Sequence, residues 1–328
     1  MEFRPRVLRD VTVVDTTTTL LGRPSALPLA LAPTGFTRMM HHQGERAVVR
    51  VAEGAGIPYA LSTLGTTSIE DMAAAAPTAR KWFQLYVWRD RGAGKELVER
   101  AQAAGYEALI LTVDMPVAGA RLRDVRNGLT IPLADPGDRP GRRHPPLVVV
   151  QPAHHRSPGV RLPDLLGGHG RRADQPDVRP RPDPAGPVVA AGELVGAADV
   201  KGIQHVDDAR MVVDHGADAV VSDHGGRQLD RAPTPLEVLP TVVDAVGDGA
   251  EVLVDGGVRS GADVVAAVAL GAKACLVGRA YLYGLMAGGE RGVQRAIDIL
   301  TSEITRTMQL LGTDSVSRLE PAHVRLRP

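Results

Sequence analysis

Short apolar runs recur along the chain, and most are followed by Gly, Ser, Thr or Asp and then by an amphipathic stretch. Runs of this kind are typical of buried parallel strands. We predict eight of them, at Leu29–Pro33, Tyr59–Ser62, Trp82–Val87, Ala108–Val113, Val200–Ile203, Ala219–Ser222, Val252–Asp255 and Ala274–Val277. Between them, stretches such as AGKELVERAQAAG and GADVVAAVALG carry apolar residues at helical spacing. This alternation predicts a (β/α)8 TIM barrel with its active site at the C-terminal strand ends.

One segment breaks the pattern. Residues 134–199 hold twelve of the 25 prolines and contain no Lys, Ile, Met, Asn, Thr, Phe, Tyr or Trp. A segment so rich in Pro, Gly and Arg cannot form a packed barrel layer, and we expect it to be disordered as written. It stands in the place of the fourth helix and most of the fifth strand. We therefore expect both elements to be disrupted within an otherwise single domain spanning residues 1–328.

Composition narrows the class of protein. The 328 residues include 38 Lys or Arg and 38 Asp or Glu, a balance that argues against a nucleic-acid partner. The single cysteine, Cys275, excludes an intrachain disulfide and fits a reducing compartment. No apolar run is long enough to span a bilayer, and the N-terminus has no signal-peptide pattern. We expect a soluble cytoplasmic protein.

The stretch VVSDHGGRQLD places His224 and Arg227 just beyond a predicted strand. Three residues apart on a Gly-Gly turn, the two side chains can converge on one small ligand. Histidine is suited to general-base chemistry near neutral pH, and arginine offers a planar fork for a carboxylate. A solvated turn with a capping histidine is the alternative interpretation.

A second stretch, EVLVDGGVRSGADVVAAVALGAKACLVGRAYLYG, is typical of a phosphate site in a barrel. It runs from a strand through a DGG turn and Arg259 to a helix, then to a second strand with Gly278 and Arg279 at its end. Loop amides and a helix N-terminus can face the anion, and the two arginines can neutralise it. Glycines that serve only as tight turns are the alternative. Several barrel families share such a site, so the stretch does not identify the phosphate.

Together these stretches resemble the FMN-dependent α-hydroxy-acid dehydrogenase and oxidase family, and within it the L-lactate dehydrogenase branch. The resemblance extends through LAPTGFTRMMHHQGE, ALSTLGTTSIEDMA, KWFQLYVWRD, LILTVDMPVAGARLRDVRNG and VKGIQ, and covers nearly everything outside residues 134–199. The chain begins after the family's N-terminal helical region, and Asp223 stands where the family usually has Asn. We therefore expect a truncated member.

The resemblance implies FMN as the cofactor and a small L-2-hydroxy acid as the substrate, with L-lactate oxidised to pyruvate. The electron acceptor would be a quinone, another carrier or oxygen, and the acceptor could bring the protein to the periphery of a membrane. A homo-oligomer is compatible with the resemblance, because family members often form tetramers.

The resemblance also implies catalytic roles at the strand ends. His224 would take a proton while the substrate α-hydrogen leaves for flavin N5, as hydride or after carbanion formation. Asp114 would pair with the imidazole and stabilise its protonated form. Arg227 and Arg121 would hold the substrate carboxylate, and Tyr86 would donate a hydrogen bond to the substrate.

The remaining implied contacts are with the cofactor. Lys201 would lie at the flavin N1–O2 edge, where a cation stabilises the anionic reduced flavin. The other contacts are Thr34, Ser62, Gln84 and Thr112 at the isoalloxazine ring, Ser222 near it, Asp255 at the ribityl chain, and Gly257, Arg259, Gly278 and Arg279 at the phosphate. No metal site is expected.

The odd composition of residues 134–199 has an explanation in the gene. With GC-rich codons, a one-base shift of the reading frame turns LVVVQPAHHRSP into WWWCNLLTTEP, and relatives in the lactate branch carry WW followed by LLTTEP there. The same shift converts LADPGDRPGRRHPPL into SLTPATVLADATRRW, GHGRRADQPDVRP into a GTVAELINQMFDP-type helix, and VVAAGELVGAADVKG into LSWLRESWSGPLMVKG. We infer that about residues 133–199 are an out-of-frame translation between two compensating insertions or deletions. The pair His154 and His155 is then not a metal site.

This inference predicts that the polypeptide as written is poorly stable and binds FMN weakly, because a barrel needs closure to remove its sheet edges. Two other functions stay open. One is another phosphate-binding FMN or nucleotide barrel enzyme, which would share DGGVRSGA but lack the His224–Arg227 pair with Arg121. The other is an inactive product of a decayed gene. Bleaching of a yellow protein by L-lactate would distinguish the hydroxy-acid enzyme from another phosphate-binding barrel enzyme. Recovery of flavin binding after repair of the reading frame would support the decayed gene.

Overall fold

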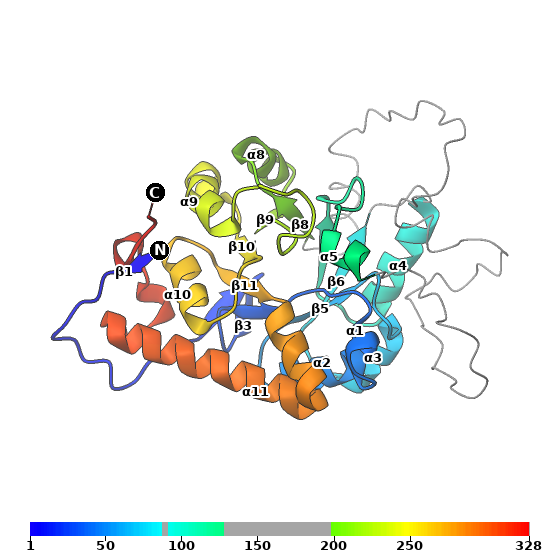
Figure 1. Cartoon of the computed structure of the whole chain (residues 1–328), viewed down its shortest axis with the longest axis horizontal. Helices are drawn as coiled ribbons and strands as arrows, with labels where there is room; N and C mark the ends of the chain where they lie inside the picture. Colours follow the sequence, from blue (N-terminus) through cyan, green and yellow to red (C-terminus); the bar gives the residue numbers. More distant parts are fainter. Residues whose placement is uncertain (87–90, 128–197, 328) are drawn as a thin grey trace.

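A computed structural model describes residues 1–86, 91–127 and 198–327 of the chain. Eight parallel strands close a barrel in the order β10-β11-β4-β5-β6-β7-β8-β9, which confirms the predicted (β/α)8 architecture. Figure 1 shows the strands with helices around them. The barrel strands are β4 (Leu29–Leu31), β5 (Tyr59–Ser62), β6 (Lys81–Tyr86), β7 (Ala108–Thr112), β8 (Ala198–Ile203), β9 (Asp218–Ser222), β10 (Val252–Asp255) and β11 (Ala274–Val277). The bounds differ from the predicted ones by at most two residues, and Val87 lies outside the described part.

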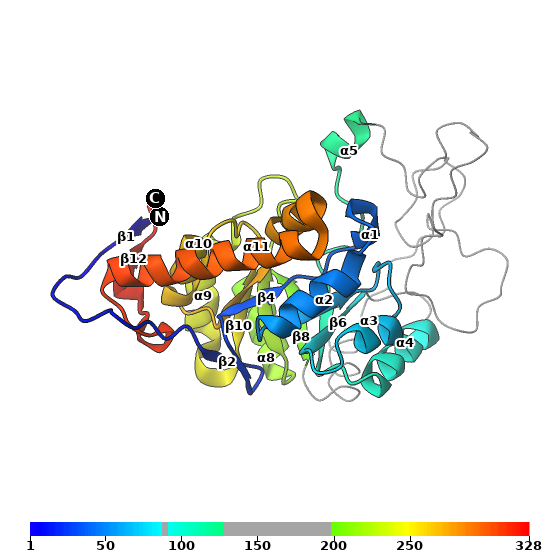
Figure 2. The same cartoon turned by 90° about the horizontal axis from the view of Figure 1, so that it is seen from below.

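Helices surround the barrel, and the long helix α11 packs against both α10 and α2 (Figure 2). It changes direction at Gly288 and Gly289, which have non-helical backbone angles. The helices are α1 (Thr37–Met40), α2 (Gly44–Gly54), α3 (Ile69–Ala75), α4 (Arg91–Ala103), α5 (Leu122–Arg126), α8 (Val206–Asp214), α9 (Pro235–Val246), α10 (Gly261–Ala269) and α11 (Arg279–Leu311). Short 3-10 turns span Gly247–Gly249, Val316–Arg318 and Pro321–His323. Among the described residues, no helix is both long and apolar enough to cross a membrane.

Two small antiparallel sheets flank the barrel. One pairs β1 (Glu2–Phe3) with β12 (Val324–Arg325), and the other is a hairpin of β2 (Thr18–Leu20) and β3 (Arg23–Ser25). Leu20 of the hairpin is fully buried within the apolar cluster inside the barrel. The backbone N–H of Leu21 donates to Glu251, which directly precedes β10. The hairpin therefore closes the N-terminal end of the barrel, opposite the strand ends that carry the predicted site.

The core has two parts because successive side chains of a strand point to opposite faces. The inner cluster fills the barrel with residues such as Trp82, Ile110, Val220 and Leu253. The larger outer cluster lies between the strands and the helices. Parallel strands that are buried on both faces need near-continuous apolar runs, which is why the sequence marked them clearly.

Strand β8 differs from the expectation. The sequence predicted that most of this strand would be lost, yet it spans Ala198–Ile203 and pairs with β7 on one side and β9 on the other. Ala198, Val200 and Ile203 are buried in the outer cluster, so the strand packs its apolar side chains against the surrounding helices. A bulge lies between Lys201 and Ile203 in its pairing with β9. The place of the fourth helix, the rest of residues 134–199 and the His154–His155 pair lie outside the described residues.

Candidate active site

The predicted cofactor residues gather at the C-terminal rim of the barrel. Each of the eight strands, or the loop directly after it, supplies one of them: Thr34, Ser62, Gln84, Thr112, Lys201, Ser222, Asp255 and Gly278. In a parallel barrel all the C-terminal strand ends lie at one face, so residues that are far apart in sequence meet there.

A buried ion pair spans β8, β9 and β10. Lys201 Nζ lies 2.8 Å from Asp255 Oδ2 and donates to Ser222 Oγ at 2.9 Å. Ser222 Oγ in turn donates to Asp255 Oδ2 at 2.7 Å. Burial alone would raise the pKa of Asp255, but the Lys201 ammonium and the hydrogen bonds from Lys201 and Ser222 lower it. The site therefore holds a fixed cation, Lys201, whose position is set by an ionised carboxylate.

A row of uncharged polar groups crosses the three strands opposite. Ser62 Oγ donates to Gln84 Oε1 at 3.1 Å, and Gln84 Nε2 donates to Thr112 Oγ1 at 2.9 Å. The backbone N–H of Thr63 also donates to Gln84 Oε1. These contacts orient the amide of Gln84, with its oxygen toward β5 and its nitrogen toward β7. The row gives one wall of the rim both donors and acceptors in fixed positions, as a flat polar ligand requires.

His224 and Asp114 form a close pair although they are 110 residues apart. His224 Nδ1 lies 2.9 Å from Asp114 Oδ1, and their side chains are only 19% and 11% exposed. His224 has a left-handed φ of 56°, and its backbone N–H donates to Ser222 Oγ at 3.0 Å. A carboxylate that accepts from Nδ1–H leaves Nε2 free to take a proton. The pair therefore has the form of an oriented general base.

Gly202 in β8 determines where Asp114 can lie. Its φ is 115°, and a Cβ built on it would be 2.6 Å from Asp114 Cβ and 2.9 Å from Asp114 N. Real Cβ atoms do not approach other atoms so closely, so only glycine fits here. Strand β8, which lies between β7 and β9, thus packs directly against Asp114 of the His224–Asp114 pair.

The two predicted substrate arginines lie near each other. Arg121 Nη2 donates to Gln228 Oε1 at 3.1 Å, and Arg227 Nη2 donates to Asp124 Oδ2 at 3.2 Å. Burial, and then the positive charge of Arg227, lower the pKa of Arg121. Arg121 Nε is buried and has no hydrogen-bond partner among the described residues. Two neighbouring guanidinium groups, with the Arg121 Nε–H available to donate a hydrogen bond, favour an anionic ligand.

Tyr86 lies at the end of β6. Burial, and then the negative charge of Asp114, raise the pKa of the Tyr86 phenol well above its usual value. The phenol is therefore protonated at neutral pH and can donate a hydrogen bond.

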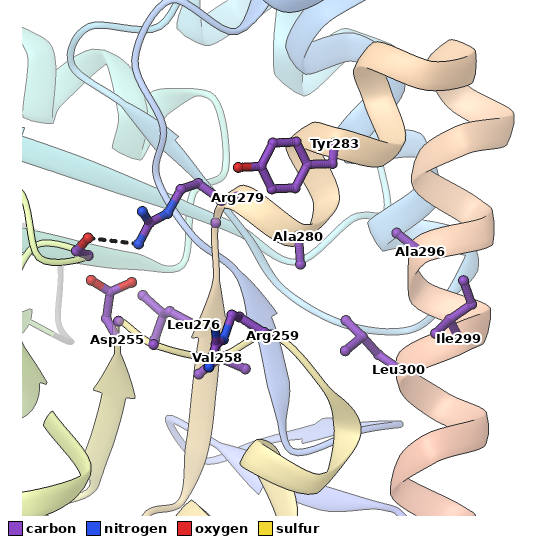
Figure 3. A pocket seen from close by; sticks show the side chains of 14 residues that line it. Asp255, Val258, Arg259, Leu276, Arg279, Ala280, Tyr283, Ala296, Ile299 and Leu300 are labelled. Atoms are coloured by element: carbon purple, nitrogen blue, oxygen red, sulfur yellow. Dashed lines mark hydrogen bonds between the residues drawn. The ribbon is translucent and has the colours of Figure 1, made fainter. Parts of the chain in front are cut away.

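A cavity of about 610 Å³ opens beside the ion pair, after β10 and β11 (Figure 3). Arg279 projects across it, and its Nη2 donates to the Gly225 carbonyl at 2.7 Å. Gly256 and Gly257 turn the chain with φ values of 107° and 74°, which other residues rarely adopt. Gly257 has no heavy atom within 4 Å of a built Cβ, so its backbone is open to an approaching ligand. The lining residues are Gly225, Asp255, Gly256, Gly257, Val258, Arg259, Leu276, Gly278, Arg279, Ala280, Tyr283, Ala296, Ile299 and Leu300.

Three residues of the site were not predicted from the sequence. Gln228 joins the loops after β7 and β9, because its Nε2 donates to the Val117 carbonyl at 3.0 Å while its Oε1 accepts from Arg121. Its position beside Arg227 was the only available signal. Gly202 and Tyr281, whose hydroxyl contacts Thr34, gave no signal, because their partners lie far away in the sequence.

A parallel barrel with an arginine- and glycine-lined cavity beside an oriented histidine and two arginines has the architecture of an enzyme that uses a phosphate-bearing cofactor. Comparison with known proteins shows which group of enzymes this is: residues 1–326 match the family model described as FMN-dependent dehydrogenase. The chain therefore belongs to the FMN-dependent dehydrogenase family. Its cofactor is FMN and it is a hydroxy-acid oxidoreductase, as the resemblance predicted.

Its relatives act on more than one kind of hydroxy acid, according to their names. A Mycobacterium tuberculosis protein with the provisional name L-lactate dehydrogenase is 51% identical over 333 residues, which are 99% of this chain and 79% of the relative. The 4-hydroxymandelate oxidase of Amycolatopsis orientalis is 42% identical, over 98% of this chain and 86% of the relative. A crystal structure of mandelate oxidase with 3,3-difluoro-2-hydroxy-3-phenylpropionic acid has a TM-score of 0.79 and 40% identity, covering 98% of this chain and 85% of that one.

Proposed function

We propose that this chain oxidises an L-2-hydroxy acid, with L-lactate as the first candidate, and that His224 is the base. The observation that carries the proposal is the His224–Asp114 contact of 2.9 Å beside Arg121 and Arg227. A base next to two guanidinium groups matches a substrate that carries a hydroxyl group one carbon away from a carboxylate. The name of the relative from M. tuberculosis supports lactate.

The residues at the rim fit FMN. Arg259, Arg279 and the open backbone at Gly257 suit a phosphate, and Asp255 suits the ribityl hydroxyls. Thr34, Ser62, Gln84 and Thr112 would face the ring, with Ser222 close to it. Lys201 would place its positive charge at the N1–O2 edge. When bound, FMN accepts the two electrons that leave the α-carbon of the substrate.

The protein groups handle the carboxylate and the proton. Arg121 and Arg227 would hold the carboxylate, and the protonated phenol of Tyr86 would donate a hydrogen bond to the substrate. His224 Nε2 would take up the released proton as the hydroxyl carbon becomes a carbonyl. Asp114 would stabilise the imidazolium through Nδ1. The low exposure of this pair strengthens their electrostatic interaction.

A second candidate substrate is an aryl 2-hydroxy acid such as L-mandelate. The relatives named 4-hydroxymandelate oxidase and mandelate oxidase support it at 42% and 40% identity. Both candidates require the same His224, Asp114, Arg121 and Arg227, so they differ only in the group that replaces the methyl of lactate.

The test is reduction of the FMN-loaded full chain without oxygen. We expect L-lactate to bleach the yellow flavin absorption and D-lactate to leave it unchanged, and faster bleaching by L-mandelate would favour the second candidate. Admitting oxygen, or adding a quinone, then shows which acceptor restores the colour. A chain carrying the re-read segment in place of residues 133–199 is the control for folding. An FMN-loaded chain that no L-2-hydroxy acid bleaches would contradict the proposal.

A further inference from the structure

Tyr281 joins the loop after β4 to the start of α11. It lies two residues after Arg279 and is fully buried. Its Oη is 2.5 Å from Thr34 Oγ1 and 3.2 Å from the Ala32 carbonyl oxygen. Its ring also packs edge to face against Tyr59, with centroids 6.3 Å apart. The Tyr281 hydroxyl in α11, which follows β11, therefore contacts two residues of the loop after the neighbouring strand β4.

The hydrogen atoms available to this cluster limit how Thr34 can bond. Burial raises the pKa of the Tyr281 phenol, so the phenol keeps its proton. The phenol has one hydrogen, so it donates either to the Ala32 carbonyl oxygen at 3.2 Å or to Thr34 Oγ1 at 2.5 Å, and in the first case Thr34 donates to Tyr281. Thr37 Oγ1 donates to the Thr34 carbonyl at 3.1 Å and lies 3.2 Å from Thr34 Oγ1. In either case the Thr34 hydroxyl is held between Tyr281 and Thr37.

We propose that Tyr281 is a positioning residue that fixes the orientation of the Thr34 hydroxyl at the flavin ring and thereby sets the affinity for FMN. The inference rests on the proposed function, in which Thr34 contacts the ring. A threonine hydroxyl that nothing orients rotates among several acceptors. The contact with Tyr281 removes that freedom before the cofactor arrives, which lowers the entropy lost on binding.

The test compares four full-length apoproteins: wild type, Tyr281→Phe, Thr34→Val and the double variant. FMN dissociation constants come from quenching of FMN fluorescence, and the visible absorption of the bound flavin reports its hydrogen bonds. We expect Tyr281→Phe to weaken FMN binding about fivefold, as for one neutral hydrogen bond, and to shift the absorption. In the Thr34→Val background the same change should have no further effect, because Tyr281 acts through Thr34.

Tyr106→Phe is the matched control. Tyr106 is also a buried tyrosine, and its hydroxyl donates to the Ile69 carbonyl at 3.1 Å, away from the rim. Tyr106→Phe should lower the unfolding free energy by about as much as Tyr281→Phe does, and should leave FMN affinity and flavin absorption unchanged. The unfolding free energies of the four apoproteins provide a second cycle, in which the Thr34 and Tyr281 changes should be non-additive.

The outcomes separate this inference from the proposed function. If Thr34→Val weakens FMN binding but Tyr281→Phe does not, or if their effects simply add, the role of Tyr281 is overturned. If Thr34→Val binds FMN as the wild type does, the assignment of Thr34 to the ring fails, and the inference fails with it. Failure to take up FMN by both the wild-type chain and the chain carrying the re-read segment contradicts both.

Discussion

The phosphate pocket and the base cluster of this barrel are built in opposite ways. We use "phosphate pocket" for the cavity proposed to hold the FMN phosphate, lined by Gly257, Arg259, Gly278 and Arg279, and "base cluster" for the proposed base and its neighbours, Asp114, Arg121, His224 and Arg227. Apart from Gly225, the polar side of the pocket comes from the loop after β10 and from the start of α11 after β11, which belong to one continuous stretch of chain. The base cluster comes from two loops whose strands, β7 and β9, are separated in the barrel by β8.

The difference shows which part of the site depends on the closed barrel. The phosphate pocket is a product of local sequence, because the stretch from β10 to the start of α11 supplies all four of its defining residues. The base cluster exists only if β8 pairs with both neighbours and Gly202 leaves room for Asp114. The anomalous composition of residues 134–199 reaches into β8 at its first two positions. A defect there should damage the base cluster before the phosphate pocket.

The largest expected effect comes from removing the base. His224→Gln should lower the rate of flavin reduction by L-lactate about a thousandfold, within the range for general-base catalysis. FMN affinity should stay within twofold of wild type, because the phosphate pocket is untouched. Anaerobic stopped-flow measurements and FMN titration provide the two values. A rate loss below tenfold would remove His224 from the base role.

The second prediction concerns Gly202, which packs against Asp114 of the base cluster. Gly202→Ala puts a Cβ 2.6 Å from Asp114 Cβ, so Asp114 must move away from His224. We expect the reduction rate to fall about a hundredfold, since a displacement near 1 Å is enough for such a loss.

Gly216→Ala is the control for this change. Gly216 also has a positive φ, 75°, but no heavy atom lies within 4 Å of a built Cβ. It should lower stability and leave the reduction rate nearly intact. Equal rate losses in the two variants would mean that backbone strain, and not the position of Asp114, limits the reaction.

The third prediction concerns Asp199, at the other end of β8. Both of its carboxylate oxygens are buried without a hydrogen-bond partner among the described residues. Burial, and then the negative charges of Asp218 and Glu251, raise its pKa. An acid whose pKa is higher in the folded than in the unfolded chain stabilises the fold at low pH. That contribution is lost as the pH rises above the unfolded value of about 3.9.

The frame-shifted reading places Met at position 199, which provides the experiment. Asp199→Met should raise the unfolding free energy at pH 7 by about 2 kcal/mol and flatten its decline with rising pH. Asp199→Asn keeps a polar side chain but removes the charge, and should recover the flat pH profile with less gain in stability. Denaturant unfolding between pH 4 and 8 measures both, and an unchanged pH profile in Asp199→Met would contradict the prediction.

The smallest effect is expected in the phosphate pocket. Arg259→Ala should weaken FMN binding about tenfold, the value of one charge-assisted hydrogen bond. Riboflavin, which lacks the phosphate, should bind both proteins equally. At saturating FMN, the reduction rate should match that of wild type, because the base cluster is intact. Weaker riboflavin binding in the variant would show that Arg259 supports the fold of the pocket and not the phosphate.

The sequence predicted what depends on local pattern. The strand bounds followed from apolar runs, and the phosphate pocket followed from DGG, Arg259 and the Gly278–Arg279 pair, because these residues form one structural unit. The wrong expectation concerned the extent of β8: the anomalous composition before Val200 was expected to disrupt most of this strand, yet the strand begins at Ala198 and pairs with both neighbours. Contacts across the barrel, such as Gly202 beneath Asp114, depend on strand order in space, and composition and spacing carry no record of that order.

All eight strand ends supply residues to one proposed cofactor site. A ligand held in this way binds only the closed barrel, so each bound molecule removes a chain from the equilibrium with unfolded states. At a free FMN concentration one hundred times the dissociation constant, this linkage adds about 2.7 kcal/mol to the unfolding free energy. For a chain with so unusual a composition between β7 and β8, the flavin supply of the cell would then determine how much of the protein stays folded.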